Sequence, residues 1–334
     1  MDLASIPKIE NHVHLEGAIP YATLWQLIQK YGGDRSINSL EQLEEKFIFR
    51  DFNHFIETWI WKNQFLREYE DFRMISDAVF RDLARQNVKY AEIFISPSTF
   101  RDKLDVRRIV EAISGSMDRN PEIRIGLIVD FVRNHGQDSE LRALSEISEV
   151  RDLGIIGIGI GGSEKEFPPE LFTDLFEKAR NLGFRTTAHA GEAAGADSIW
   201  KALRYLNVDR IGHGTRAAED PALLDHLAEH KIPVELCPIS NLRTRVISSL
   251  DEHPFRTFLE RGIPVSINTD DPKMFGNSLA QEYQALAETF NMDDTDICSV
   301  IIESIKTTWL EEKEQAKLIE DFTDELTIRR QNNP

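Results

Sequence analysis

Short apolar runs, each followed by an amphipathic stretch, recur eight times along the chain. The runs are compact and rich in β-branched residues, as in strands that are buried on both faces. They are Lys8–His14, Val88–Ser96, Ile123–Asp130, Ile155–Gly161, Arg185–His189, Arg210–His213, Pro233–Cys237 and Pro264–Asp270. Strands that alternate with helices predict a parallel sheet. Eight such units fit an α/β fold of the closed (β/α)8 TIM-barrel type.

An open, doubly wound sheet is the alternative for this alternation. That fold would carry a glycine-rich phosphate loop in the first strand-to-helix turn, and the sequence has no G-x-G-x-x-G there. The glycines of 157–162 fall in the fourth unit, where their spacing does not fit a dinucleotide loop. There is no internal repeat or Pro/Gly/Ser-rich linker, so residues 1–334 are expected to form a single barrel domain.

The segment Ser36–Tyr69 departs from the regular alternation. It carries aromatic residues at helical spacing, among them Phe55, Trp59 and Trp61, which indicates first of all a packing face. Our second interpretation is a helical cap, inserted after the first strand and covering the mouth of the barrel. After the eighth strand, Leu279–Phe290 and Asp294–Ile319 predict extra C-terminal helices.

The charge balance limits the partners of the protein. The 334 residues include 57 acidic and 39 basic side chains, giving a formal net charge of −18, which would repel a nucleic-acid backbone. No apolar run is long enough to span a membrane, and no secretory signal precedes the first strand. The two cysteines, Cys237 and Cys298, suggest no disulfide framework. We therefore expect a cytoplasmic enzyme acting on a small molecule, and leave its oligomeric state open.

Imidazole and carboxylate groups stand at the ends of several predicted strands. His12 and His14 end the first strand, on one face because they are two residues apart. His189, His213 and the pair Asp270-Asp271 end the fifth, sixth and eighth strands. A single strand-end histidine is more often an ordinary polar residue, but this set shares one rim of the barrel, where active sites of this fold lie. Three histidines and an aspartate are suitable ligands for zinc, and iron or manganese also fits the ligand types.

Glu192 stands three residues after His189, in His-Ala-Gly-Glu. It has two interpretations: a carboxylate placed favourably at a helix N-terminus, or a proton donor for metal-assisted hydrolysis.

These residues belong to longer motifs, and together they resemble the adenosine deaminase family of the amidohydrolase superfamily. The motifs are Pro7–Gly17 with its H-x-H, His189–Glu192, Arg210–Thr215, Cys237–Asn241 and Ser266–Pro272. The H-x-H alone is shared by many amidohydrolases. The order H-A-G-E, G-H-G and T-D-D-P is specific to the aminopurine deaminases, and the resemblance spans nearly the whole chain.

The resemblance implies a role for each strand-end group. One Zn²⁺ per chain would be held by His12, His14, His189 and Asp270. His213 would orient or deprotonate the attacking water, and Glu192 would protonate purine N1 while water adds to C6 and ammonia leaves. Asp271 would hydrogen-bond to N7, the backbone N–H of Gly162 would meet N3, and Glu16 would contact the sugar. The implied reaction is zinc-dependent deamination of a 6-aminopurine nucleoside of the adenosine type.

Two residues depart from the family pattern. Glu16 stands where adenosine deaminases usually carry aspartate, and Gly159 stands where many relatives carry aspartate in the fourth strand. Both changes leave the aminopurine chemistry intact and leave adenine and 6-aminodeoxyfutalosine as alternative substrates. The segment Asp271–Leu279 resembles bacterial members that act on adenosine or on 6-aminodeoxyfutalosine.

Two other functions fit the sequence less well than an aminopurine deaminase. A phosphotriesterase-like hydrolase would need a metal-bridging lysine in the fourth strand, and 155–162 contains none. A silent, purine-binding or partner-binding member would have lost a ligand or the N1 acid, and this chain keeps all of them.

Overall fold

The computed structural model describes residues 2–49 and 52–332, and eight parallel strands in sequence order form its barrel. Their bounds are β1 (Lys8–His14), β2 (Val88–Ile95), β3 (Arg124–Val132), β4 (Ile155–Gly161), β5 (Arg185–Ala190), β6 (Arg210–His213), β7 (Val234–Leu236) and β8 (Val265–Ile267). The seam between β8 and β1 is closed by an isolated bridge, in which the His14 N–H donates to the Asp270 carbonyl at 2.8 Å and the Asp270 N–H donates to the His12 carbonyl at 3.1 Å. The predicted (β/α)8 barrel is confirmed.

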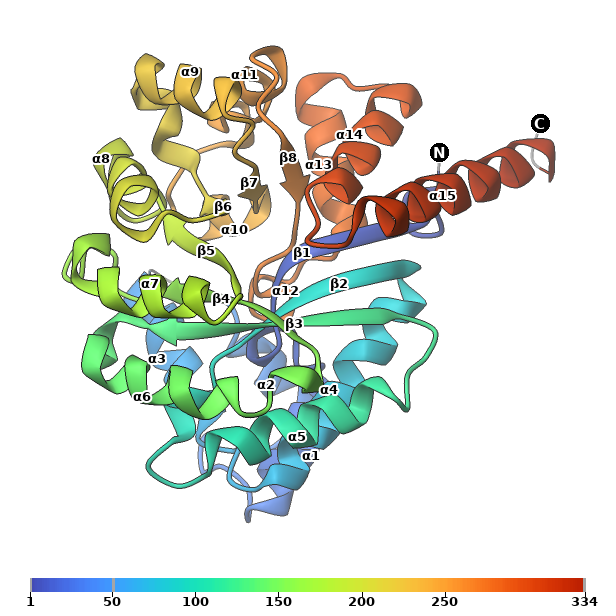
Figure 1. Ribbon diagram of the computed structural model, residues 1–334. Helices are drawn as coiled ribbons and strands as arrows, with labels where there is room; N and C mark the ends of the chain where they lie inside the picture. Colours follow the sequence, from blue (N-terminus) through green and yellow to red (C-terminus); the bar gives the residue numbers. More distant parts are fainter. Residues whose placement is uncertain (1, 50–51, 333–334) are drawn as a thin grey trace.

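Helices form an outer ring around these strands (Figure 1). Those between β1 and β2 are α1 (Tyr21–Lys30), α2 (Leu40–Glu45), α3 (Phe52–Asn63) and α4 (Tyr69–Arg85). Those that follow are α5 (Val106–Met117), α6 (Gln137–Ser148), α7 (Thr173–Asn181), α8 (Ala196–Lys201), α9 (Pro221–Glu229), α10 (Pro238–Arg243), α11 (Phe255–Glu260), α12 (Pro272–Phe275), α13 (Leu279–Phe290), α14 (Asp294–Lys306) and α15 (Glu312–Asn332). Within the described residues, no helix is both long enough and apolar enough to cross a bilayer.

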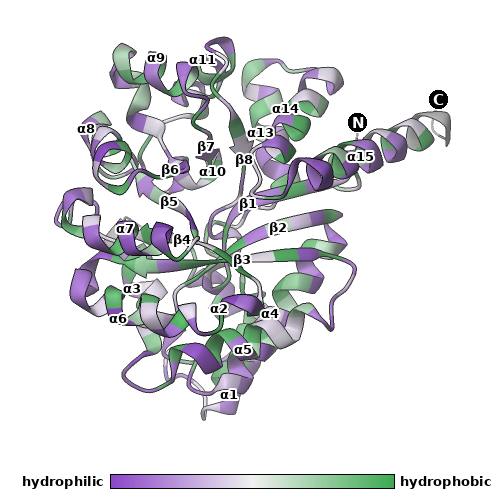
Figure 2. Ribbon diagram, in the orientation of Figure 1, coloured by the Kyte–Doolittle hydropathy of each residue, from purple (hydrophilic) through white to green (hydrophobic). Residues whose placement is uncertain are grey.

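The strands are apolar because both of their faces are covered. Within β2, for example, Ile93, Phe94 and Ile95 are all almost completely buried. The outer helices instead interleave hydrophilic and hydrophobic residues along each ribbon (Figure 2). Their apolar sides pack on the barrel, which is the arrangement that amphipathic periodicity predicts.

The C-terminal helices differ from the prediction in one respect. The single helix expected over Asp294–Ile319 is interrupted after Lys306, and α15 starts at Glu312. In the interruption, the Trp309 N–H donates to Glu92 at 2.7 Å, and the Thr307 carbonyl accepts from Arg210 at 3.0 Å. The Trp309 ring also covers the Arg210 guanidinium, 3.8 Å from the ring centroid. Glu92 and Arg210 are both buried. The bond that Glu92 accepts and the bond that Arg210 donates satisfy backbone groups that a continuous helix would otherwise pair.

Candidate active site

Four predicted ligands converge at the carboxyl ends of the strands. One ligand atom from each of His12, His14, His189 and Asp270 lies within 4.8 Å of the others, and all four residues are buried. β1 supplies the first two, β5 the third, and the residue that bridges β8 to β1 the fourth. Asp270 takes up a left-handed backbone conformation, with φ of 65°, which a residue other than glycine adopts only where its surroundings hold it.

The hydrogen bonds of these rings show that the cluster suits a cation. His12 Nδ1 lies 2.7 Å from Glu235, and His189 Nδ1 lies 3.2 Å from the Ile160 carbonyl, so both Nδ1 atoms donate. The two Nε2 atoms therefore present lone pairs to each other at 3.1 Å when the rings are neutral. Burial opposes a charge on His12, yet hydrogen bonds that it donates to Asp270 and Glu235 raise its pKa to about 10. The surroundings thus favour a positive charge at this point, which a proton or a metal ion can supply.

The other imidazoles are kept neutral, as metal ligands must be. Burial lowers the pKa of His14 to about 3 and holds the pKa of His189 well below its usual range. Hydrogen bonding to His12, together with His213 and His14, lowers the pKa of Asp270 against the effect of burial, so Asp270 is ionised. The imidazoles and this carboxylate offer nitrogen and oxygen donors of the kind that hold a divalent metal ion.

Two supporting residues were missed by the sequence reasoning. Glu235, in β7, accepts the His12 Nδ1 hydrogen at 2.7 Å, and Ser240, in α10, donates to Asp270 at 2.6 Å. Burial opposes ionisation of Glu235, but Arg210 and His12 hold its pKa below its usual range. Such partners fix the orientation and tautomer of a ligand ring. The signal for Glu235 was an acidic residue within an otherwise apolar strand.

His213 and Glu192 face each other beside the cluster. His213 Nε2 lies 3.7 Å from Glu192 Oε2 and 4.0 Å from Asp270 Oδ2. The Asn241 amide lies 3.1 Å from His213 Nδ1 and donates to it, which leaves the remaining ring hydrogen on Nε2. Burial lowers the pKa of His213 to about 4 and, with the charges of Asp270 and Glu164, raises the pKa of Glu192 to about 8. A neutral imidazole and a protonated carboxylic acid therefore coexist at neutral pH.

The loop that carries Glu192 is held by a second carboxylate, which the sequence reasoning also missed. Glu164 accepts hydrogen bonds from the backbone N–H groups of Gly191, Ala193 and Ala194 at 2.6, 2.8 and 2.9 Å. Three backbone donors converging on one buried carboxylate fix the turn. The position of Glu192 therefore does not depend on a flexible loop.

Asp271 and Glu16 are both buried beside the cluster, and each has one oxygen without a hydrogen-bond partner in the part of the chain that the structure describes. The other Glu16 oxygen accepts from the Ser96 N–H at 3.0 Å. A Cβ on Gly17 would lie 1.7 Å from Asp271 Oδ1, so glycine is required there. Unmatched buried acceptors are costly, and they are typical of groups that meet a ligand.

The α3 helix adds a buried cation that the sequence reasoning did not select. Lys62 is 1% exposed, donates to Asn63 at 2.8 Å and lies 3.7 Å from the centroid of the Trp59 ring. Burial lowers the pKa of Lys62 to about 7, against the opposing charges of Asp271 and Glu16. The Trp59 ring lies edge-on to His14, with centroids 6.2 Å apart. This helix therefore packs directly against the site.

Gly162 follows β4 with φ of 97°, and a Cβ there would lie 2.7 Å from Asn134 Oδ1. Only glycine fits this conformation and this contact. Its predicted contact with N3 stays a prediction.

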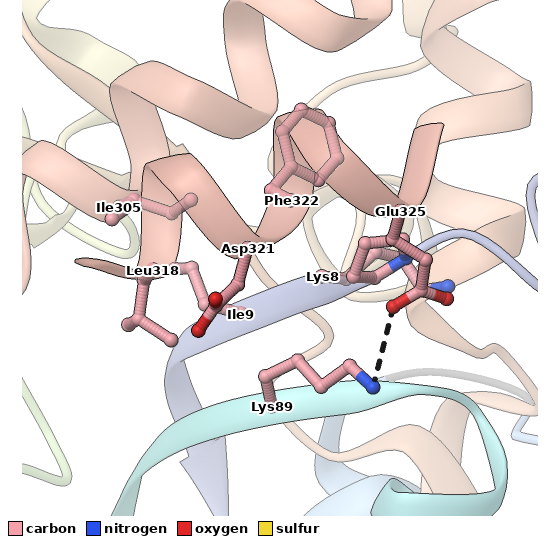
Figure 3. Close-up of a pocket in the computed structure, with 9 residues that line it drawn as sticks. Lys8, Ile9, Lys89, Ile305, Leu318, Asp321, Phe322 and Glu325 are labelled. Carbon is pink, nitrogen blue, oxygen red and sulfur yellow. Dashed lines mark ion pairs between the residues drawn. The ribbon is translucent and has the colours of Figure 1, made fainter. Parts of the chain in front are cut away.

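A separate hollow of about 240 Å³ lies at the opposite end of the barrel (Figure 3). It is bounded by the first residues of β1 and β2, including Lys8 and Lys89, and by α15. An ion pair of 3.5 Å joins Lys89 to Glu325 across it. The candidate metal ligands lie at the other ends of the strands, so the hollow is no part of the site.

The geometry defines a metal-dependent hydrolase site on a (β/α)8 barrel. The family model for adenosine deaminase matches residues 7–325, so the chain belongs to the adenosine deaminase family, whose chemistry is hydrolytic deamination. An aminodeoxyfutalosine deaminase from Streptomyces avermitilis is 36% identical, over 95% of this chain and 90% of the relative.

Two solved structures are similar over almost the whole chain. An adenine deaminase from Arthrobacter aurescens superposes with a TM-score of 0.90 at 28% identity, covering 97% of this chain and 100% of the other. A zinc-bound amidohydrolase from Burkhoderia ambifaria superposes with a TM-score of 0.84 at 26% identity, covering 99% and 93%.

Proposed function

We propose that the protein is a zinc-dependent deaminase of a 6-aminopurine nucleoside, converting it to the 6-oxo product and ammonia. The observation that carries the proposal is the close grouping of all four predicted ligands with Glu192 and His213. Zinc is supported by the nitrogen and oxygen donor set and by the zinc-bound amidohydrolase of similar structure. Iron(II) and manganese(II) are the alternatives, and elemental analysis of the purified protein distinguishes them.

The side chains of the site have separate roles in the proposed reaction. When bound, zinc lowers the pKa of a water molecule to about 7. Glu192, protonated at neutral pH, donates its proton to purine N1, and this makes C6 electrophilic. Water adds to C6 and gives up both of its protons: one passes to the 6-amino group, which leaves as ammonia, and the other restores the Glu192 acid, while the product keeps the proton on N1. The His213 tautomer set by Asn241 favours orienting the attacking water over deprotonating it, since Nε2 carries the hydrogen.

Asp271 and Glu16 are assigned to the substrate. Burial and the charge of Asp270 raise the pKa of Asp271 well above its usual range, so its carboxyl group can carry a proton and donate it in a hydrogen bond to N7. The unpartnered Glu16 oxygen is suited to accept from a sugar hydroxyl. Both residues are buried, so these hydrogen bonds would form away from bulk water, where they discriminate strongly between substrates.

We further propose that residues 36–69 act as the cap predicted from the sequence. Support comes from the contacts of α3: Trp59 lies against His14, and Phe55 stacks on Phe275 of α12 with ring centroids 5.2 Å apart. The cap would exclude water from the site and form the pocket for the sugar and its 5′ substituent.

The likeness to an aminodeoxyfutalosine deaminase supports a nucleoside with a modified 5′ position. Adenine is the second candidate, because Glu16 adds a methylene where a ribose would lie and because a solved adenine deaminase is similar over the whole chain.

Ammonia release by the zinc-loaded protein tests these proposals on adenosine, 2′-deoxyadenosine, adenine and 6-aminodeoxyfutalosine. We expect one nucleoside to be turned over with the highest kcat/KM. Turnover of adenine alone would favour the second candidate. No turnover of any compound by protein that contains zinc would contradict the proposed function.

A further inference from the structure

Asp130 is a buried carboxyl group for which the proposed reaction has no use. It lies in β3, two residues before the strand ends, and is 4% exposed. Its Oδ1 atom has no hydrogen-bond partner within the described chain. Burial raises the pKa of Asp130 well above its usual range; His12 opposes this shift, and Glu16 and Glu140 add to it. A buried polar atom without a partner destabilises the fold, so the position calls for an explanation.

Two glycines of β4 make room for this carboxyl group. The parallel pairing of β3 with β4 sets Asp130 opposite Gly159. A Cβ on Gly159 would lie 3.0 Å from Asp130 Oδ1, and a Cβ on Gly161 would lie 3.0 Å from Oδ2. The same Gly161 position is 3.6 Å from the His189 ring. The Asp130 carboxyl group therefore lies next to a part of the β4 backbone that carries no side chains, on the side of β4 that faces the candidate metal ligands.

Two structural roles do not account for Asp130. Its oxygens are outside the group of ligand atoms that lie within 4.8 Å of one another, so it is not a fifth member of that cluster. Arg133, directly after β3, donates instead to the carbonyls of Phe167 and His189 at 2.8 and 2.9 Å.

The expected orientation of the purine places its N9 edge near Asp130. Asp271, after β8, is assigned to N7, and Gly162, after β4, is assigned to N3. In a purine, N9 lies between N3 and N7, on the side away from N1. The strands that run from β8 to β4 on this side of the barrel are β1, β2 and β3. Glu16 follows β1 and Asp130 lies on β3, so both carboxyl groups flank the N9 substituent.

We propose that Asp130 is a specificity-determining residue that hydrogen-bonds to a sugar hydroxyl of the substrate, on the opposite side of the N9 substituent from Glu16. This assignment rests on the proposed nucleoside deaminase function. It also explains Gly159, because a side chain at that position would occupy the space that the Asp130 carboxyl group uses.

The test compares Asp130→Asn and Asp130→Ala with the unmodified protein. Glu140→Gln is the matched control, since Glu140 is equally buried but binds Ser98 and His135 away from the cluster. Zinc content, Tm and the kinetics of ammonia release are measured with the preferred nucleoside and with adenine. We expect both Asp130 variants to keep their zinc. Their kcat/KM for the nucleoside should fall about tenfold, mainly through KM, which corresponds to the loss of one hydrogen bond. Their activity on adenine should change much less.

Several outcomes would overturn the assignment of Asp130. They are an equal loss on nucleoside and adenine, no loss on either, loss of zinc, or turnover of adenine alone by the unmodified protein. Failure of the unmodified protein to deaminate any compound overturns the proposed function instead. In that case, calorimetric binding of purine riboside and purine decides the role of Asp130. A selectivity for the riboside that the Asp130 variants lose supports the assignment, and an unchanged or absent selectivity overturns it.

Discussion

At the scale of single residues, Glu192 is the group whose chemistry depends most on its environment. Its pKa is raised to about 8 by burial first, and by the charges of Asp270 and Glu164 second. The acid is thus protonated below pH 8 and loses its proton above it. A divalent cation nearby pulls this value down, so kcat/KM is expected to fall as pH rises through a value at or below about 8. A pH–rate profile of the zinc-loaded enzyme measures this decrease in kcat/KM. A flat profile between pH 6 and 9 would argue against Glu192 as the proton donor.

Replacing the acid tests the same role directly. Glu192→Gln keeps the shape of the side chain but has no acidic proton, so we expect kcat to fall by about 10²–10⁴-fold. Zinc content should be unchanged, because Glu192 is not among the clustered ligands. Near-normal kcat in a metal-loaded variant would remove Glu192 from this role.

Glu235 is expected to affect the binding of the metal and not the binding of the purine. Its carboxylate accepts the His12 Nδ1 hydrogen at 2.7 Å and also pairs with Arg210 at 2.7 Å. Loss of such a partner typically lowers metal affinity by about 10–100-fold. Glu235→Gln should show this loss in zinc titrations against a competing chelator, and should recover kcat at saturating zinc. Unchanged zinc affinity would leave Glu235 as part of the buried ion network only.

At the scale of elements, α3 connects the cap to the site. Phe55 stacks on Phe275, and Ile60 on the same helix is 65% exposed. If the cap forms the substrate pocket, Phe55→Ala should raise KM several-fold with a smaller effect on kcat, while Ile60→Ala should change neither. Steady-state kinetics of the two variants on the preferred nucleoside make the comparison. Equal behaviour of the two would show that the packing of α3 does not govern substrate binding.

The strands and helices also differ in how far the sequence could predict them. The strands were predictable because burial on both faces imposes a continuous apolar run. The clustering of the predicted ligands was predictable because they end those runs. The break after Lys306 was not predictable, since it depends on Arg210 and Glu92, which are far away in the sequence. Asp130 was overlooked although it ended the predicted third strand, because its surroundings depend on the pairing of β3 with the glycines of β4.

At the scale of the whole molecule, the metal site and the closure of the barrel coincide. His12 and His14 belong to β1, and Asp270 belongs to the bridge that joins β8 to β1, so an ion bound by these residues would tie the first and last strands together. His189 extends the same attachment to β5, on the far side of the barrel. An ion that binds only the folded chain stabilises it in proportion to the logarithm of its concentration over Kd.

Removal of the metal should therefore destabilise the fold as well as abolish activity. Zinc at about a thousand times its Kd contributes about 4 kcal/mol to the free energy of unfolding, so Tm should fall by several degrees in chelator and should rise with added zinc. His12→Ala is the control: it lacks a ligand, and its Tm should respond to neither treatment. Calorimetry at fixed protein concentration measures both proteins. A Tm of the unmodified chain that is indifferent to zinc would show that the seam between β8 and β1 holds through its backbone bonds alone.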